Sequence, residues 1–379
     1  MPLHFTFAVT LLGFVGVNAA RVVLQLYALD LGAGPTGVGL LVAAYYVCPL
    51  LFSWPAGTLG DRYGPRGPLL FSAVCGTLGM VLPYFVRTMP ALYIASALSG
   101  MSFAFFLVIV QNLVGVLSAP EKRAQNFANF SLVGAVANFI GPLVAGLSID
   151  HLGHPIACLV TTAFPFATGV MIMGWGKRLP GGSHRPAPRA RILDTLADPA
   201  VLRILAIGSL VQLGTDLFVF YIPVYGVGIG LSASTIGALL ATFAAASFII
   251  RVVLPRLIRR LGEYKLLAYS FYVAALGFAL VPLFHNVVML ALVSFLFGLG
   301  TGCGQPIATM LMFSMAADGR SGEALGLRLT VNNLVRVIAP PLFGFIVSGF
   351  GLAPVFYINA AMMGAGGMLG GLKNTAGKR

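Results

Sequence analysis

The chain has 379 residues, of which 58% are hydrophobic and 9% are charged, and its formal net charge is +13. A soluble domain carries about 25% charged residues, so this composition excludes a water-soluble fold and indicates a membrane-embedded protein. The apolar runs are continuous rather than alternating, which excludes a transmembrane barrel and predicts an all-α integral membrane protein.

A membrane-spanning helix needs roughly 20 mostly apolar residues, and the chain contains twelve such runs. The first six predicted spans are 5–27, 36–57, 68–87, 90–117, 125–148 and 154–176. A polar stretch at 177–199, rich in Pro, Gly and Arg, predicts a cytoplasmic linker. The last six predicted spans are 201–226, 233–254, 265–284, 287–315, 324–348 and 352–372. We therefore expect a six-helix bundle at 1–176, a linker at 177–199 and a second six-helix bundle at 200–379.

The positive charge is distributed very unevenly along this topology. With both termini inside, 18 of the 23 Lys and Arg residues fall in or beside cytoplasmic segments, four lie within spans, and only Arg87 lies outside. The positive-inside rule then predicts a multi-pass protein of the cytoplasmic (inner) membrane with both termini in the cytoplasm. The basic balance is explained by topology, so we expect no nucleic-acid partner.

The second half of the chain repeats the first at a constant offset of 198 residues. The offset pairs Tyr27 with Tyr225, Gly39 with Gly237, Gly79 with Gly277, Gly100 with Gly298, Pro142 with Pro340 and Gly146 with Gly344. Chance matches would not keep one register over more than 100 residues. The two bundles are therefore predicted to be pseudo-symmetric.

One motif follows the second span. Residues 57–66 read Gly-Thr-Leu-Gly-Asp-Arg-Tyr-Gly-Pro-Arg, and a degenerate copy of this motif lies at 255–265. Together with the six-plus-six spans, this motif resembles the loop 2–3 signature of the major facilitator superfamily. The positions that match the signature are Gly57, Asp61, Arg62, Gly64 and Arg66. The resemblance implies secondary transport by alternating access, in which two bundles expose a central site to one side at a time.

The same resemblance implies a gating role for this motif. In the family the Asp docks against the start of the eleventh span and latches the cytoplasmic face, which assigns that role here to Asp61. Arg259 occupies the equivalent place in the second half, so the two latches are predicted to be unequal. The alternative is that the motif is only a basic turn that anchors the inner leaflet.

A second motif lies on the fifth span. Gly141, Pro142 and Gly146 resemble the Gly-Pro motif of the family's exporters and antiporters, and Pro340 repeats the proline. Proline within a helix frees a backbone carbonyl and bends the helix, so these residues are predicted to shape the ends of the cavity. A generic proline kink is the alternative explanation.

One position departs from the family pattern. Many proton-coupled members carry an Arg and a Gln ahead of a glycine on the fourth span, where this chain has Ser96, Ser99 and Gly100. The usual proton relay of that span is therefore not expected here.

Several polar side chains lie inside predicted spans, where each is costly and usually faces a cavity or a partner. Their spacing places them on shared helix faces. We expect them to bind substrate or couple transport: Asn18, Arg21, Gln25, Gln212, Asp216, Gln305, Arg328, Asn332 and Arg336.

Asp216 is the only acid near the middle of any span. It has two candidate roles, as a structural partner of Arg21 or Arg336, or as the group whose titration couples transport to protons. One ion pair would leave one of the two arginines without a counter-charge. Because guanidinium binds carboxylate or phosphate in a bidentate manner, the excess favours an anionic solute.

The sequence predicts a secondary active transporter of a small organic solute, an organic anion or acidic amphipathic compound, coupled to protons and leaning to efflux. The alternatives are a multidrug/proton antiporter for lipophilic compounds and an organic anion uptake symporter. No recognisable catalytic cluster is present, so an enzyme is not expected. Neither cofactor nor metal is expected, and the family resemblance implies a monomer.

Overall fold

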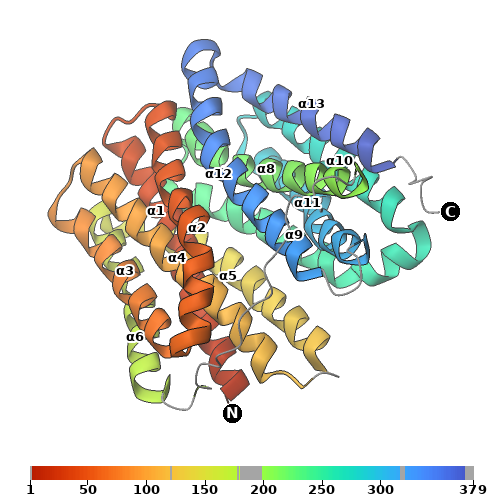
Figure 1. Ribbon diagram of the computed structural model, residues 1–379. Helices are drawn as coiled ribbons and strands as arrows, with labels where there is room; N and C mark the ends of the chain where they lie inside the picture. Colours follow the sequence, from red (N-terminus) through yellow and green to blue (C-terminus); the bar gives the residue numbers. More distant parts are fainter. Residues whose placement is uncertain (1, 120–121, 177–178, 180–198, 316–320, 372–379) are drawn as a thin grey trace. The chain divides into compact units, whose positions relative to one another are not determined.

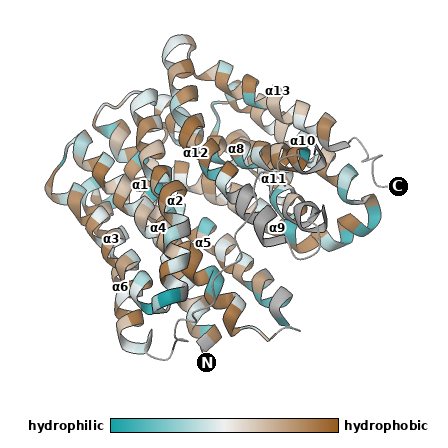
Figure 2. Ribbon diagram, in the orientation of Figure 1, coloured by the Kyte–Doolittle hydropathy of each residue, from teal (hydrophilic) through white to brown (hydrophobic). Residues whose placement is uncertain are grey.

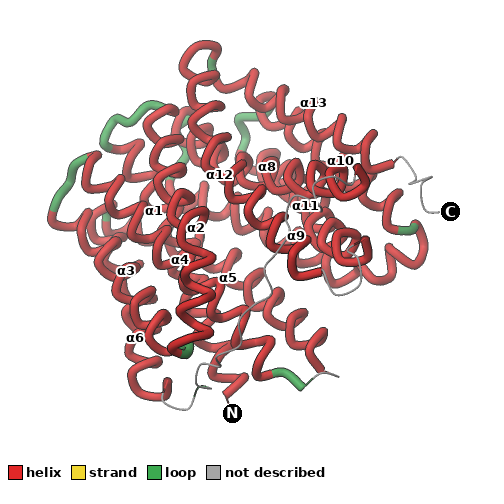
Figure 3. The backbone as a smooth tube through the Cα atoms, viewed as in Figure 1, coloured by secondary structure: helices red, strands yellow, loops and turns green. Residues whose placement is uncertain are grey.

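The computed structural model (Figure 1) describes residues 2–119, 122–176, 179, 199–315 and 321–371. In these ranges the chain is helical and the connections are short, as Figure 3 shows. The helices of the first half are α1 (Pro2–Asp30), α2 (Pro35–Tyr63), α3 (Arg66–Phe85), α4 (Met89–Leu117), α5 (Arg123–Leu152) and α6 (His154–Trp175). Those of the second half are α8 (Pro199–Gly228), α9 (Ala233–Leu261), α10 (Glu263–Leu280) with the 3-10 turn η3 (Val281–Leu283), α11 (Val287–Met315), α12 (Ser321–Phe350) and α13 (Leu352–Gly371).

Twelve helices in the described ranges are long and apolar enough to cross a membrane. Apolar residues dominate every one of them (Figure 2). Large apolar side chains within the helices remain exposed, for example Phe166 at 60% and Phe345 at 63%. Such surfaces suit acyl chains rather than water, so the predicted all-α membrane fold is confirmed. The helices mostly extend past the predicted spans, since their polar ends have little hydropathy but keep helical hydrogen bonding.

The predicted repeat appears in the backbone geometry. Six glycines of the described ranges adopt a positive φ, near +80°, a conformation that a side chain would strain. They form three pairs at the offset of 198 residues: Gly32 with Gly230, Gly64 with Gly262, and Gly153 with Gly351. The hydrogen bonds around them repeat as well, because Leu31 N–H donates to Tyr27 O and Ile229 N–H donates to Tyr225 O.

The repeat also sets how closely helices approach. A Cβ added at Gly100 on α4 would overlap the carbonyl oxygen of Tyr45 on α2. The equivalent Gly298 on α11 meets the carbonyl oxygen of Phe243 on α9 in the same way. Small residues permit such backbone-to-backbone packing in lipid, where no hydrophobic force drives helices together.

The described residues form two compact units. Unit 1 comprises those within Met1–Ala187 and Pro223–Ala241, and unit 2 those within Pro188–Ile222 and Thr242–Arg379. The end of α8 and the start of α9 therefore cluster with the helices of the first half, and the division into bundles at 177–199 stays a prediction. Close packing explains this clustering, since a Cβ at Gly237 on α9 would overlap the carbonyl oxygen of Pro142 on α5. Residues 180–198 of the predicted linker lie outside the described part of the chain.

Each unit has its own core. In unit 1, α1 packs against α4, α5 and α6, and α4 also contacts α2 and α3. Phe14 and Phe106 meet edge to face there, with ring centroids 5.6 Å apart. In unit 2, α10 packs against α11 and α13. Phe218 stacks on Phe297 at 4.3 Å. These cores fix the helix faces that carry the polar residues described next.

Candidate functional site

The predicted polar residues lie on four helices. Helix α1 carries Asn18, Arg21 and Gln25, α8 carries Gln212 and Asp216, α11 carries Gln305, and α12 carries Arg328, Asn332 and Arg336. The α1 residues belong to unit 1 and the others to unit 2. Within unit 2, most of the predicted residues meet.

An ion pair joins α8 to α12. The Arg336 guanidinium donates from Nε to Asp216 Oδ2 at 2.6 Å. Only 20% of the Arg336 side chain and 11% of the Asp216 side chain are exposed. Charges removed from water to this degree are stable only when paired. Of the two partners that the sequence offered Asp216, the structure places Arg336 against it.

A relay of amides leads to the same carboxylate. Gln305 Nε2 on α11 donates to Gln212 Oε1 at 2.8 Å, and Gln212 Nε2 donates to Asp216 Oδ2 at 2.8 Å. Asp216 Oδ2 therefore accepts from both Gln212 and Arg336. We call Gln305, Gln212, Asp216 and Arg336 the polar network. It connects α11, α8 and α12 in a region where each amide can satisfy its neighbour.

Other predicted residues have different surroundings. Ser209 Oγ donates to Asn332 Oδ1 at 3.3 Å, which makes a second link between α8 and α12. Asn18 Nδ2 donates to Phe14 O of its own helix at 2.8 Å. The side chain of Arg328 lies outside the described residues. Arg251 is a structural anchor, because its Nε donates to Gly302 O at 3.3 Å.

Arg21 belongs to unit 1, whereas this network belongs to unit 2. Its guanidinium stacks over the Tyr46 ring, 5.6 Å from the centroid. No carboxylate in the described ranges pairs with it. The excess arginine predicted from the sequence is therefore Arg21.

The motif at 57–66 is largely helical rather than a loop. Helix α2 continues through Tyr63, because its i→i−4 bonding persists until Gly64 turns the chain at φ +84°. Arg66 then opens α3 and donates from its guanidinium to Met173 O at 3.2 Å. Arg62 stacks on the neighbouring Tyr63 ring. A Cβ at Gly57 would only touch Val108 on α4. The Asp61 side chain is outside the described residues, so its latch role stays a prediction.

The Gly-Pro motif on α5 faces two neighbours within unit 1. A Cβ at Gly141 would press on Asn18 of α1, and one at Gly146 would overlap the carbonyl oxygen of Ala233 at the start of α9. Pro142 and, on α12, Pro340 lie inside their helices. The glycines thus act as packing surfaces.

The structure adds Asp150, which the sequence reasoning missed. This residue near the end of α5 accepts hydrogen bonds from the backbone N–H groups of Ala233 at 3.0 Å and Ser234 at 2.8 Å. The carboxylate therefore caps the N-terminus of α9, where unpaired N–H groups and a partial positive charge favour an anion. Because 83 residues separate Asp150 from Ala233, no local sequence signal reveals the contact.

Asp150→Ala is expected to destabilise the protein by about 1 kcal/mol through loss of this cap. The amides of Ala233 and Ser234 should then exchange hydrogen faster, as measured by hydrogen–deuterium exchange with mass spectrometry. Asp150→Asn keeps an acceptor and serves as the control. Unchanged exchange in Asp150→Ala would contradict a capping role.

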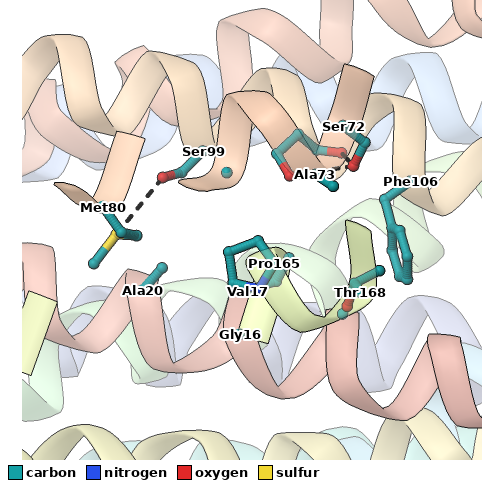
Figure 4. Close-up of a pocket in the computed structure, with 13 residues that line it drawn as sticks. Gly16, Val17, Ala20, Ser72, Ala73, Met80, Ser99, Phe106, Pro165 and Thr168 are labelled. Carbon is teal, nitrogen blue, oxygen red and sulfur yellow. Dashed lines mark hydrogen bonds between the residues drawn. The ribbon is translucent and has the colours of Figure 1, made fainter. Parts of the chain in front are cut away.

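A hollow lies inside unit 1 between α1, α3, α4 and α6, with about 410 Å³ of empty space in and around it (Figure 4). Its hydroxyls have partners inside the bundle, since Ser72 Oγ donates to Ser102 O at 2.8 Å and Ser99 Oγ points to Met80 Sδ at 3.9 Å. No charged residue lines it. Ser99 is therefore a packing residue, and this hollow offers a solute no charge to bind.

Twelve spanning helices, an internal repeat and a polar network within the spans define a membrane transporter. The sequence profile of the Major Facilitator Superfamily matches residues 6–340, with a second match at 229–373. The chain therefore belongs to this superfamily, and it is not an enzyme.

Curated relatives include resistance and efflux proteins. The class H tetracycline resistance protein of Pasteurella multocida is 25% identical over 83% of this chain and 80% of its own. The multi-drug resistance efflux pump PmrA of Streptococcus pneumoniae is 22% identical over 86% of this chain and 84% of its own. The quinolone resistance protein NorA of Staphylococcus aureus is 23% identical over 90% of this chain and 89% of the NorA chain.

Solved structures confirm the fold. A POT family transporter in complex with a thioalcohol-conjugated peptide aligns with a TM-score of 0.83 over 97% of this chain and 94% of its own, at 13% identity. At that identity the likeness concerns the fold alone.

Proposed function

We propose that the protein exports small organic anions, or amphipathic compounds with an acidic group, across the cytoplasmic membrane by alternating access. The observation that carries this proposal is the charge balance of the intramembrane residues. Arg336 neutralises Asp216, whereas Arg21 pairs with no described carboxylate. A guanidinium left without a counter-charge in a membrane attracts an anion. Relatives named for efflux and resistance support the outward direction.

Proton coupling is assigned to Asp216. A proton on this carboxylate would dissolve the ion pair with Arg336 and weaken the bond from Gln212, so one protonation changes contacts on two helices. Coupling to protons needs a group whose contacts, and so whose affinity for a proton, differ between two conformations. The placement of both termini in the cytoplasm rests on the 18 Lys and Arg residues of the inner segments.

The same ion pair favours a second candidate, an organic anion uptake symporter. Protonation of Asp216 breaks the pair that Arg336 Nε forms with Oδ2, and the guanidinium can then bind an anion through this donor. Proton and anion binding would strengthen each other, and linkage makes this effect reciprocal. A proton and an anion that bind together are transported together, so an inward flow of protons drives uptake of the anion. Export would instead use Arg21 for the anion and return the proton separately.

Everted and right-side-out membrane vesicles separate these functions. We expect radiolabelled benzenesulfonate to accumulate in energised everted vesicles, whose lumen is acidified, and to be lost on adding an uncoupler. Accumulation only in right-side-out vesicles would instead establish the symporter. Vesicles without the protein give the baseline.

Three probes of similar apolar character but different charge test the solute class. Benzenesulfonate is an anion, benzenesulfonamide is neutral, and tetraphenylphosphonium is a cation. The proposal expects transport of the anion, and its loss in Arg21→Gln. Transport of tetraphenylphosphonium alone would overturn it in favour of a multidrug antiporter for lipophilic cations.

A further inference from the structure

A small hollow lies between α1, α2 and α4 of unit 1, whereas the polar network belongs to unit 2. Its polar and aromatic lining comes from Arg21, Gln25, Tyr45, Tyr46 and Ser96, and about 240 Å³ in and around it, part of it open to the surroundings, contains no protein atoms. The enclosed part is small, so at most the polar head of a solute can enter it, not a whole molecule.

Arg21 supplies an oriented cation to this hollow. Its guanidinium lies over the Tyr46 ring, and Tyr46 is itself only 2% exposed. A cation–π contact uses the face of the guanidinium, whereas the N–H donors lie in its plane. Asp30, the other charged residue of α1, is nine residues further on, or about 13 Å along the helix. The donors of Arg21 thus stay available to an oxyanion.

Gln25 supplies an acceptor with no partner. Its side chain is 3% exposed, and its carbonyl Oε1 has no hydrogen-bond partner among the residues that the structure describes. A buried acceptor left unsatisfied destabilises a fold, and such groups are rare in native proteins. Ser96, by contrast, already donates to Leu41 O at 2.7 Å. Gln25 Oε1 is therefore an acceptor in the hollow that a donor on a bound group can satisfy.

We propose that this hollow binds the head of the transported solute, and that the head is a carboxylate with a neutral O–H or N–H donor on the adjacent carbon. The carboxylate would bind Arg21, and the neighbouring donor would bind Gln25 Oε1. A hydroxyl fits better than an ammonium, because a second cation beside Arg21 would be repelled. The 2-hydroxy carboxylates are the simplest such class. This inference rests on the proposed transport of organic anions and narrows its solute class.

The spacing of the two residues suits such a head. Arg21 and Gln25 are four apart on α1, so their Cβ atoms lie about 5–6 Å from each other on one helix face. A carboxylate and its 2-hydroxyl present an acceptor pair and a donor on adjacent carbons. Flexible side chains one turn apart can converge on both groups. Discrimination should be strong, because a site that contains an unpaired buried polar group rejects analogues that leave it unpaired.

Three matched compounds test this directly on the purified full-length protein by isothermal titration calorimetry. Mandelate has both groups, phenylacetate lacks the hydroxyl, and mandelamide lacks the charge. We expect mandelate to bind about tenfold more tightly than phenylacetate. Its affinity should also exceed that of mandelamide by about tenfold or more.

Variants assign the two preferences to their residues. Gln25→Met keeps the side-chain length without the acceptor and should abolish the preference for mandelate over phenylacetate. Arg21→Gln should abolish the preference for mandelate over mandelamide. Gln25→Glu places a carboxylate one turn from Arg21 and should eliminate binding of both anions, which provides a test if Gln25→Met does not fold. The matched control is Thr77→Val, because the Thr77 hydroxyl donates to Ala73 O within α3.

The outcomes separate this inference from the proposed function. Equal binding of mandelate and phenylacetate, unchanged in Gln25→Met, would overturn the inference and leave anion transport standing. Binding of tetraphenylphosphonium but of neither anion would overturn the proposed function and the inference with it. A mandelate preference that only Arg21→Gln removes would also count against the role given to Gln25.

Discussion

Replacing Arg336 by alanine is expected to lower the free energy of unfolding by about 2–3 kcal/mol. The substitution leaves the Asp216 carboxylate without its ion-pair partner where only 11% of its side chain is exposed, with Gln212 as its remaining described donor. Breaking a fully buried pair costs about 3–5 kcal/mol, and the partial exposure of this one lowers the expectation. Thermal unfolding of the purified protein in detergent measures the effect.

The double variant Asp216→Asn with Arg336→Gln is the informative comparison. It removes both charges together, so its stability should exceed that of Arg336→Ala. The stability changes of the two single variants should not sum to that of the double variant. Transport separates the two roles of Asp216. If the carboxylate titrates during transport, the double variant stays inactive although it is folded. Recovery of proton-coupled transport in the double variant would show that the pair is only structural.

Gly100→Ala is expected to lower the free energy of unfolding by about 3 kcal/mol, at the upper end for overpacking. The added Cβ would overlap the backbone carbonyl of Tyr45, which cannot rotate away as a side chain would. Helices α2 and α4 would have to separate, and the hollow that contains Arg21 and Gln25 lies between them and α1. We expect reduced yield of folded protein and weakened anion binding, measured by size-exclusion chromatography and calorimetry.

Gly174→Ala is the matched control for this prediction. Gly174 is an exposed glycine of α6 with nothing within 4 Å of an added Cβ. Alanine favours the helix there, so the variant should be at least as stable as the wild type. The repeat offers an independent check, because Gly298→Ala should reproduce the defect on the other half. A harmless Gly298→Ala would show that the equivalent contact with Phe243 can relax.

Much of the fold follows from local sequence. Hydropathy alone predicts twelve spans because each helix must satisfy its backbone in lipid. The constant offset predicts pseudo-symmetry, and the paired glycines Gly64 and Gly262 show it in the backbone. Helix ends were less predictable. Helix α2 extends to Tyr63 because polar residues such as Arg62 still form helical hydrogen bonds, although they end the apolar run.

The candidate site was predictable in its members but not in its pairing. Helical spacing placed Gln212 and Asp216 on one face of α8, and intramembrane polarity selected Arg21 and Arg336. The choice between Arg21 and Arg336 as the partner of Asp216 depends on which helices pack together. Asp150 illustrates the same limit, since a single acid near a helix end has no distinctive pattern until the start of α9 lies against it.

The sequence by itself determined the membrane class, the repeat and the list of intramembrane polar residues, because those properties depend on composition and periodicity. The resemblance of the motif at 57–66 implied the superfamily. Only the tertiary structure decided that Arg336 pairs with Asp216, that Arg21 stacks on Tyr46, and that Gln25 keeps an unsatisfied acceptor. Pairing and burial depend on distances between helices that are far apart in the chain. Helix packing sets those distances, through contacts such as that of Gly100 with Tyr45.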